Sequence, residues 1–132
     1  MIRGSITFKG LHSDDFQISI ELSDDGTVWM TTQEIAVLFN VKRSSVETDL
    51  KTLFKSDNLI ENRVKRVRHY RLENDKQCFV DYYNLEVIIA LSFRIESYSC
   101  VLFRQWVSQQ ISASIKEPDP ILGRLGTTAM MN

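Results

Sequence analysis

Two short helical patterns joined by a tight turn constrain this chain more than any other feature of its sequence. The first helix is expected to begin after Thr31, which has the capping-box spacing with Glu34, and to end at Asn40, a residue type that tolerates the left-handed conformation. The second helix is expected to begin near Arg43. Its apolar residues recur at helical intervals and form one stripe: Val46, Leu50, Leu53 and Phe54.

Four residues around this turn have the spacing of a DNA-reading helix-turn-helix. Ala36 is small enough for two helices to cross over it, Asn40 permits the turn, and Val41 and Val46 supply apolar anchors, at relative positions 0, +4, +5 and +10. The same residues also suit two amphipathic helices of an ordinary core that binds no DNA. The spacing therefore favours a helix-turn-helix and leaves the second interpretation open.

In a helix-turn-helix, the first residues of the second helix meet base edges in the major groove. Arginine and lysine pair with guanine, glutamate accepts from cytosine, and threonine donates its hydroxyl or presses its methyl group on thymine. The base-reading residues predicted here are Lys42, Arg43, Ser44, Glu47, Thr48 and Lys51.

The charges are strongly segregated along the chain, although the formal net charge is only −1. Residues 1–41 have a net charge of −4, residues 42–71 have +5, and residues 72–132 have −2. An asymmetry of this kind points to a charged partner. The phosphate-binding residues predicted from the basic window are Lys55, Arg63, Lys65, Arg66, Arg68 and Arg71.

Two β-rich segments, Val64–Leu72 and Gln77–Tyr83, flank the polar residues 73–76 and predict a hairpin. A basic hairpin directly after a reading helix is typical of the wing of a winged-helix domain, which rests on phosphates or enters the minor groove. The alternative is a solvated edge strand whose cations discourage aggregation.

The remaining elements complete an α+β domain, a winged helix-turn-helix with an N-terminal β-hairpin and two C-terminal helices. Alternation over Phe16–Leu22, an Asp-Gly turn and a short strand over Thr27–Met30 predict the first hairpin. Asn84 is expected to cap a helix from Leu85 to about Glu96, and a last helix follows from about Tyr98 to Ile115. We expect the domain to span residues 1–115, and 116–132 to form a mobile C-terminal tail.

The composition suits one domain of 132 residues and offers little for catalysis. Two histidines without a metal-binding motif, scattered glycines and acidic pairs expected in solvated loops predict no enzyme, metal, cofactor or small-molecule ligand. Cys78 and Cys100 are too few for a disulfide framework and are expected to be reduced thiols of a cytoplasmic protein. No apolar stretch approaches the length of a membrane span.

Three separated segments resemble the RhuM ("virulence protein") family in the same order: residues 28–46, residues 82–89 and the Phe103-Arg104-Gln105-Trp106-Val107 element. The Phe-Arg-x-Trp part is also similar to the Bro-N domains of phage antirepressors. The resemblance covers about residues 16–115 and implies a DNA-binding protein of genomic islands, prophages or mobile elements. Asn40 stands where the family often has glycine. The resemblance does not extend to the additional C-terminal domains of longer relatives, so it implies no effector function for this chain.

We therefore expect a transcriptional regulator that binds double-stranded DNA, with a protein-interaction module of the antirepressor type as the alternative. The helix over residues 98–115 is the expected contact of a homodimer and would also serve that alternative. Within it, Phe103 and Trp106 are predicted to be core residues. Arg94 and Arg104 are each expected to pair with an acid such as Glu86 or to bind phosphate.

Overall fold

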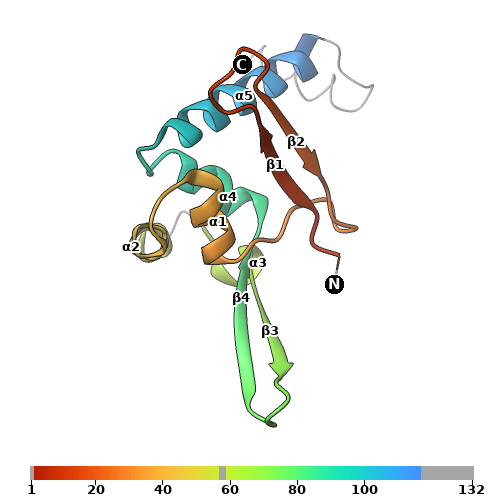
Figure 1. The fold of residues 1–132 in the computed structure, drawn as a ribbon, viewed down its shortest axis with the longest axis vertical. Helices are drawn as coiled ribbons and strands as arrows, with labels where there is room; N and C mark the ends of the chain where they lie inside the picture. Colours follow the sequence, from red (N-terminus) through yellow and green to blue (C-terminus); the bar gives the residue numbers. More distant parts are fainter. Residues whose placement is uncertain (1, 57–58, 117–132) are drawn as a thin grey trace.

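The chain folds into an α+β arrangement in which two antiparallel hairpins flank a cluster of helices (Figure 1). The computed structural model describes residues 2–56 and 59–116. Its elements are β1 (Ser5–Lys9), β2 (Gln17–Glu21), α1 (Thr32–Phe39), α2 (Arg43–Lys55), α3 (Glu61–Val64), β3 (Lys65–Arg71), β4 (Gln77–Tyr83), α4 (Leu85–Ser92) and α5 (Tyr98–Lys116).

The α1–turn–α2 unit forms as predicted. The Thr31 hydroxyl accepts a hydrogen bond from the Glu34 amide at 3.1 Å, and the Glu34 carboxylate accepts one from the Thr31 amide at 2.9 Å. Asn40 has φ 55° and ψ 49°, which reverses the chain, and the Val41 amide donates to the Ala36 carbonyl at 3.0 Å. Ala36 is buried at the start of this turn, and α2 packs against α1.

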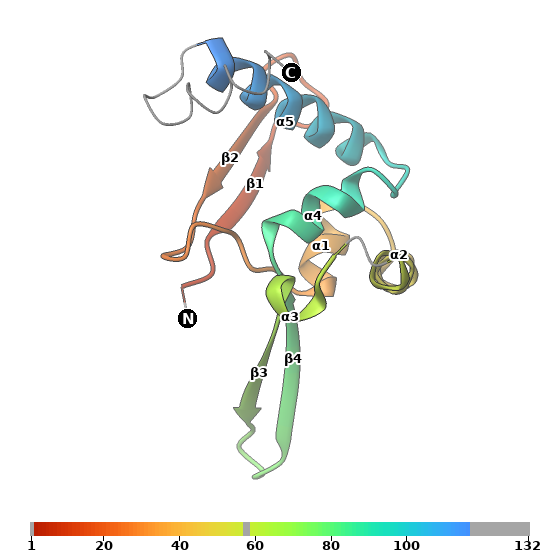
Figure 2. The same cartoon turned by 180° about the vertical axis from the view of Figure 1, so that it is seen from behind.

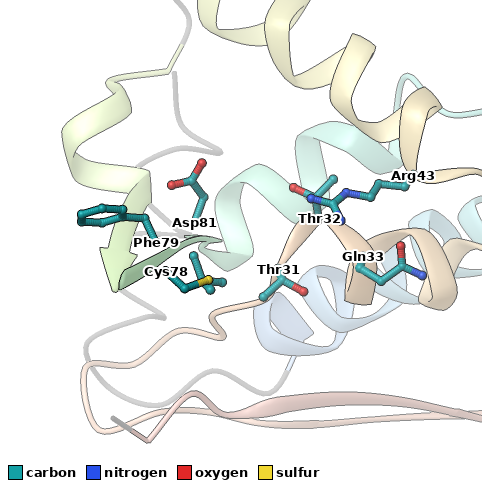
Figure 3. Close-up of a pocket in the computed structure, with 8 residues that line it drawn as sticks. Thr31, Thr32, Gln33, Arg43, Cys78, Phe79 and Asp81 are labelled. Carbon is teal, nitrogen blue, oxygen red and sulfur yellow. The ribbon is translucent and has the colours of Figure 1, made fainter. Parts of the chain in front are cut away.

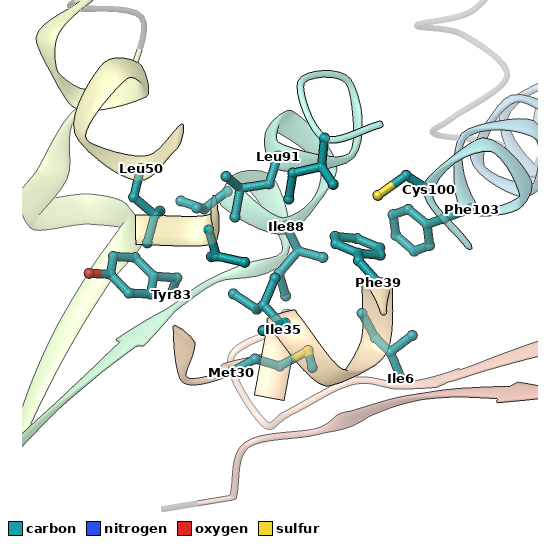
Figure 4. Packing of buried hydrophobic residues seen from close by; sticks show 14 of the residues in the cluster. Ile6, Met30, Ile35, Phe39, Leu50, Tyr83, Ile88, Leu91, Cys100 and Phe103 are labelled. Atoms are coloured by element: carbon teal, nitrogen blue, oxygen red, sulfur yellow. The ribbon is translucent and has the colours of Figure 1, made fainter. Parts of the chain in front are cut away.

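One hydrophobic core joins the helices (Figure 4). At its centre, Phe39 of α1 meets Phe103 of α5 edge to face, with ring centroids 5.6 Å apart. The predicted α2 stripe lies in this core, where Val46, Leu50 and Leu53 are buried and Phe54 is half-buried. Because these residues anchor one side of α2, the other side is turned to solvent.

The predicted basic hairpin is confirmed as the antiparallel pair β3–β4, which projects from the helices in both views (Figure 1; Figure 2). Its base is fixed by a bridge to the segment before α1: Met30 and Tyr83 exchange backbone hydrogen bonds of 2.9 and 2.8 Å. The short helix α3, which the sequence analysis did not predict, leads from α2 into β3.

The first hairpin differs from the prediction, because β2 pairs with β1 and the segment 27–30 does not pair with it. The pairing of Phe16–Leu22 with Thr27–Met30 was therefore wrong. The turn itself forms, with Gly26 at φ 80°, but the chain beyond it crosses to β4. Val28, Trp29 and Met30 are all buried, and a segment covered on both sides does not show the alternation of a hairpin strand.

The C-terminal helices agree with the prediction in type and differ in extent. The Asn84 side chain caps α4 by accepting from the Val87 amide at 3.2 Å, but α4 ends at Ser92 rather than at Glu96. Helix α5 ends at Lys116, so the first residue of the predicted tail is the last residue of this helix, and residues 117–132 lie outside the described residues.

Candidate nucleic-acid interface

The polar face of α2 is open to solvent over its first three turns. All the residues predicted to read bases are exposed: Lys42, Arg43, Ser44, Glu47, Thr48 and Lys51. The buried stripe on the opposite side holds the helix in place without using any of them. These side chains thus share one accessible surface, and their contacts with bases stay a prediction.

Two local interactions define what this face can offer. Nε of Arg43 donates to Oε1 of Glu47 at 2.9 Å, an exposed i,i+4 ion pair. The Thr48 hydroxyl donates to the Ser44 carbonyl at 2.9 Å. Since its proton is engaged in the helix, Thr48 presents a methyl group and an acceptor oxygen, and the predicted hydroxyl donation would require this bond to break.

The strand register divides the β3–β4 hairpin into two faces, because directly paired residues point the same way. On one face Val67 pairs with Asp81, and His69 with Phe79. On the other face Arg66 pairs with Tyr82, and Arg68 with Val80. The cations that are continuous in the sequence therefore separate to opposite sides of the ribbon.

Half of the predicted phosphate-binding residues form ion pairs within the protein. Lys65 lies 3.2 Å from Glu61 and 3.7 Å from Asp81, Arg66 lies 3.2 Å from Asp25, and Arg71 lies 3.7 Å from Asp75. Lys55, Arg63 and Arg68 form no such pair with any residue of 2–56 and 59–116, the part of the chain that the structure describes. Because exposed ion pairs are weak, phosphates can compete with these carboxylates at modest cost.

Lys65 is the most enclosed of these cations. Burial by itself would lower the pKa of its ammonium group, but the hydrogen bond to Glu61 and the charge of Asp81 raise that pKa above the usual value. The lysine therefore stays charged, and it compensates the Asp81 carboxylate on the same face of the hairpin.

Arg66 contacts the body of the molecule although its side chain is 52% exposed. Its guanidinium lies over the ring of Trp29, while Asp25 accepts hydrogen bonds from the Ser23 hydroxyl and from the Trp29 indole at 3.1 Å. The Ser23 hydrogen bond is the main reason that the pKa of Asp25 is lowered. Sequence reasoning missed this cluster, because Asp25 had been assigned only a place in a turn.

The start of α2 lies beside the hairpin across a cavity of about 380 Å³ (Figure 3). Arg43, the first residue of α2, lines one side of it, and Phe79 and Asp81 of β4 line the other. Thr31 and Gln33 close it from α1. The two surfaces that the sequence predicted separately are thus neighbours, joined through the first turn of α1.

Of the two arginines near α5, Arg94 pairs with an acid as one of the predicted alternatives has it, and Arg104 does not. Arg104 donates to the Ser92 carbonyl at 2.8 Å, so the expected pairing with Glu86 is wrong. Arg94 pairs with Asp49 of α2 at 3.6 Å. Phe103 is buried as predicted, whereas Trp106 is only half-buried.

An apolar groove of about 390 Å³ lies between β2, α4 and α5. Ile20, Leu85 and Phe103 are among the residues that line it, as is Ile111 of α5, which is 58% exposed. Helix α5 is thus buried at Phe103 and open at Ile111. The expected homodimer contact through residues 98–115 stays a prediction.

Within the part of the chain that the structure describes, no three metal-ligating side chains gather into a possible metal site. No described helix has both the length and the apolar character of a membrane span. Cys78 and Cys100 are free thiols, and burial raises the pKa of the Cys100 thiol.

Comparison of the chain with protein-family models, with curated proteins and with solved structures gives no match. The resemblance to the RhuM family therefore stays a prediction drawn from the three sequence segments.

Proposed function

We propose that this protein is a winged helix-turn-helix protein that binds double-stranded DNA, and that it regulates transcription from a mobile genetic element. In this proposal α2 lies in the major groove and β3–β4 is the wing. The exposed polar face of α2 beside the cationic hairpin is the observation that carries the proposal. The mobile-element context rests on the RhuM resemblance alone.

Three further features support the assignment. The αL turn at Asn40 sets two short helices against each other as a reading unit requires. The Met30–Tyr83 bridge places an extended segment beside β4 and so fixes the hairpin relative to α1. The cation-rich window from Lys42 to Arg71 contributes both surfaces.

The charge of the interface sets the expected salt dependence. Binding to phosphate releases counterions, and the slope of log K against log salt concentration is about −0.9 per neutralised phosphate. Three to five contacts, from the cations without an ion pair among the described residues and from the displaceable Arg66 and Arg71, give a slope of roughly −3 to −5. An acid such as Asp81 does not prevent this, because Lys65 compensates it.

The proposal is tested by fluorescence anisotropy with a labelled 30-base-pair duplex, titrated at several salt concentrations. We expect saturable binding with the slope given above. The antirepressor alternative, in which the apolar groove and α5 grip another regulator, predicts no binding to duplex DNA even at low salt.

A further inference from the structure

The β3–β4 hairpin carries a stacked aromatic pair on its solvent side. His69 of β3 faces Phe79 of β4, with ring centroids 4.8 Å apart and 22° between the ring planes. Phe79 is 66% exposed, and Val67 on the same face is 55% exposed. Exposed apolar side chains gathered on a projecting ribbon indicate an interaction surface rather than a stabilising core.

The surroundings of this pair are cationic. Arg71 lies two positions beyond His69 on the same face, and Lys65 lies on this face at the base of the strand, whereas Arg66 and Arg68 lie on the opposite face of the ribbon. The Asp81 carboxylate on this face is compensated by Lys65. A partner that satisfies both an aromatic ring and cations offers flat stacking groups and negative charge together, which is the chemistry of nucleic acid.

The position of the His69–Phe79 pair on the hairpin is compatible with insertion into a groove of DNA. Phe79 lines the cavity whose opposite side is Arg43, at the start of α2 (Figure 3). Each strand of the hairpin has seven residues, or about 23 Å of extended chain. In the proposed complex, with α2 in the major groove, a ribbon of this length beside α2 is long enough to extend across a phosphate backbone toward the adjacent minor groove.

We infer that Phe79, supported by the ring of His69, is a wedge that enters the minor groove and partly unstacks a base step. This inference rests on the proposed DNA binding and adds a second element of specificity to it. Apolar side chains that insert between base pairs kink the duplex, and pyrimidine–purine steps cost least to open. Recognition would thus combine base contacts from α2 with the deformability of a flanking step.

The test is a selection of bound sequences from 30-base-pair duplexes with a randomised centre, run in parallel with the wild type and three variants. The variants are Phe79→Ala, Phe79→Tyr and, as a matched control, Phe93→Ala. Phe93 is 64% exposed and lies at the C-terminal end of α4, away from the hairpin. Resonance energy transfer between a donor fluorophore and an acceptor fluorophore on the two ends of the selected duplex then reports how far the duplex bends.

We expect the wild type to select a major-groove element with a flexible step at a fixed distance from it. Phe79→Ala should keep the first element, lose the second, bind about ten-fold more weakly and bend the duplex less. Phe79→Tyr and Phe93→Ala should behave as the wild type.

Three results would overturn the wedge, and they separate it from the proposed function. If no duplex is enriched or bound, both fail. If the wild type enriches a major-groove element without a flexible step, the wedge fails and DNA binding stands. If Phe79→Ala changes neither the selected sequences nor the bending, the exposed pair serves a protein partner instead.

Discussion

The Arg66 guanidinium carbon lies 4.4 Å from the centroid of the Trp29 ring. The same guanidinium is 3.2 Å from Oδ2 of Asp25, so the base of β3 is tied to the turn before α1. Arg66, which the sequence predicts to bind phosphate, thus orients the hairpin relative to the helices.

Replacing Arg66 with Ala should destabilise the fold by about 1 kcal/mol, since an exposed cation–π contact and an exposed ion pair each contribute a fraction of this. Urea unfolding at neutral pH measures the change. Arg68→Ala is the matched control, because no ion pair or ring contact of Arg68 appears among the described residues, and it should alter stability by less than about 0.5 kcal/mol. An equal loss in the free energy of unfolding for the two variants would contradict the orienting role of Arg66.

Arg63 and Arg68 are expected to contact phosphate directly. Each change to Ala should weaken binding to all duplexes alike and reduce the salt slope by about one. Anisotropy titrations at four or more salt concentrations give this slope for the wild type and each variant. A slope that stays at the wild-type value would exclude these arginines from the DNA contact.

How far the sequence predicts this structure is clearest at the turns. Capping residues and Asn40 act within a few positions of the chain, so α1, α2 and the β3–β4 turn region were predicted correctly. The partner of β2 was missed, because the five residues of β1 were not recognised as a strand and the segment 27–30 follows β2 directly after a turn. Local alternation shows that a segment is a strand, but it does not show which other segment pairs with it.

The sequence predicted which residues belong to the candidate site, but it did not predict the ion pairs that the hairpin cations form. The exposed face of α2 follows from a single helical stripe, which is local information. The carboxylates that meet the hairpin cations come from other segments, as Asp25 does for Arg66. Asp81 could have been placed opposite Val67 by counting back from the turn, but its contact with Lys65 depends on strand twist and side-chain reach.

Asn40 holds the turn between the helices in the left-handed region, with φ 55°. Asn40→Ala should cost about 1 kcal/mol, because a β-carbon without a compensating polar group is disfavoured there. Asn40→Gly should stay within about 0.5 kcal/mol of the wild type, since glycine adopts this conformation freely. Denaturant unfolding of both variants checks the difference, and equal effects would show that the turn tolerates any side chain.

Glu34 links stability to pH. Its burial raises the pKa of the carboxyl, but hydrogen bonds from Arg3 at 2.6 Å and from the Thr31 amide outweigh this and lower it overall. A lowered pKa in the folded state adds stability above the unfolded-state pKa of about 4.3, and this stability is lost as the pH falls through the folded value.

Glu34→Gln keeps an acceptor for the cap and removes the charge. The free energy of unfolding of the wild type should therefore fall more steeply than that of the variant between about pH 5 and pH 3. Urea titrations across this range measure both. Parallel curves for the two proteins would contradict the role of the Arg3–Glu34 pair.

The central claim is that the exposed face of α2 distinguishes DNA sequences. It is tested most directly by measuring how well the variants Arg43→Ala and Lys51→Ala distinguish a selected duplex from a scrambled one. Anisotropy titrations compare a selected duplex with a scrambled duplex of the same composition, at one salt concentration. The account predicts a loss of about 1–3 kcal/mol on the selected duplex for each variant, and a clearly smaller loss on the scrambled one. Equal losses on the two duplexes, or no binding by the wild type, would contradict it.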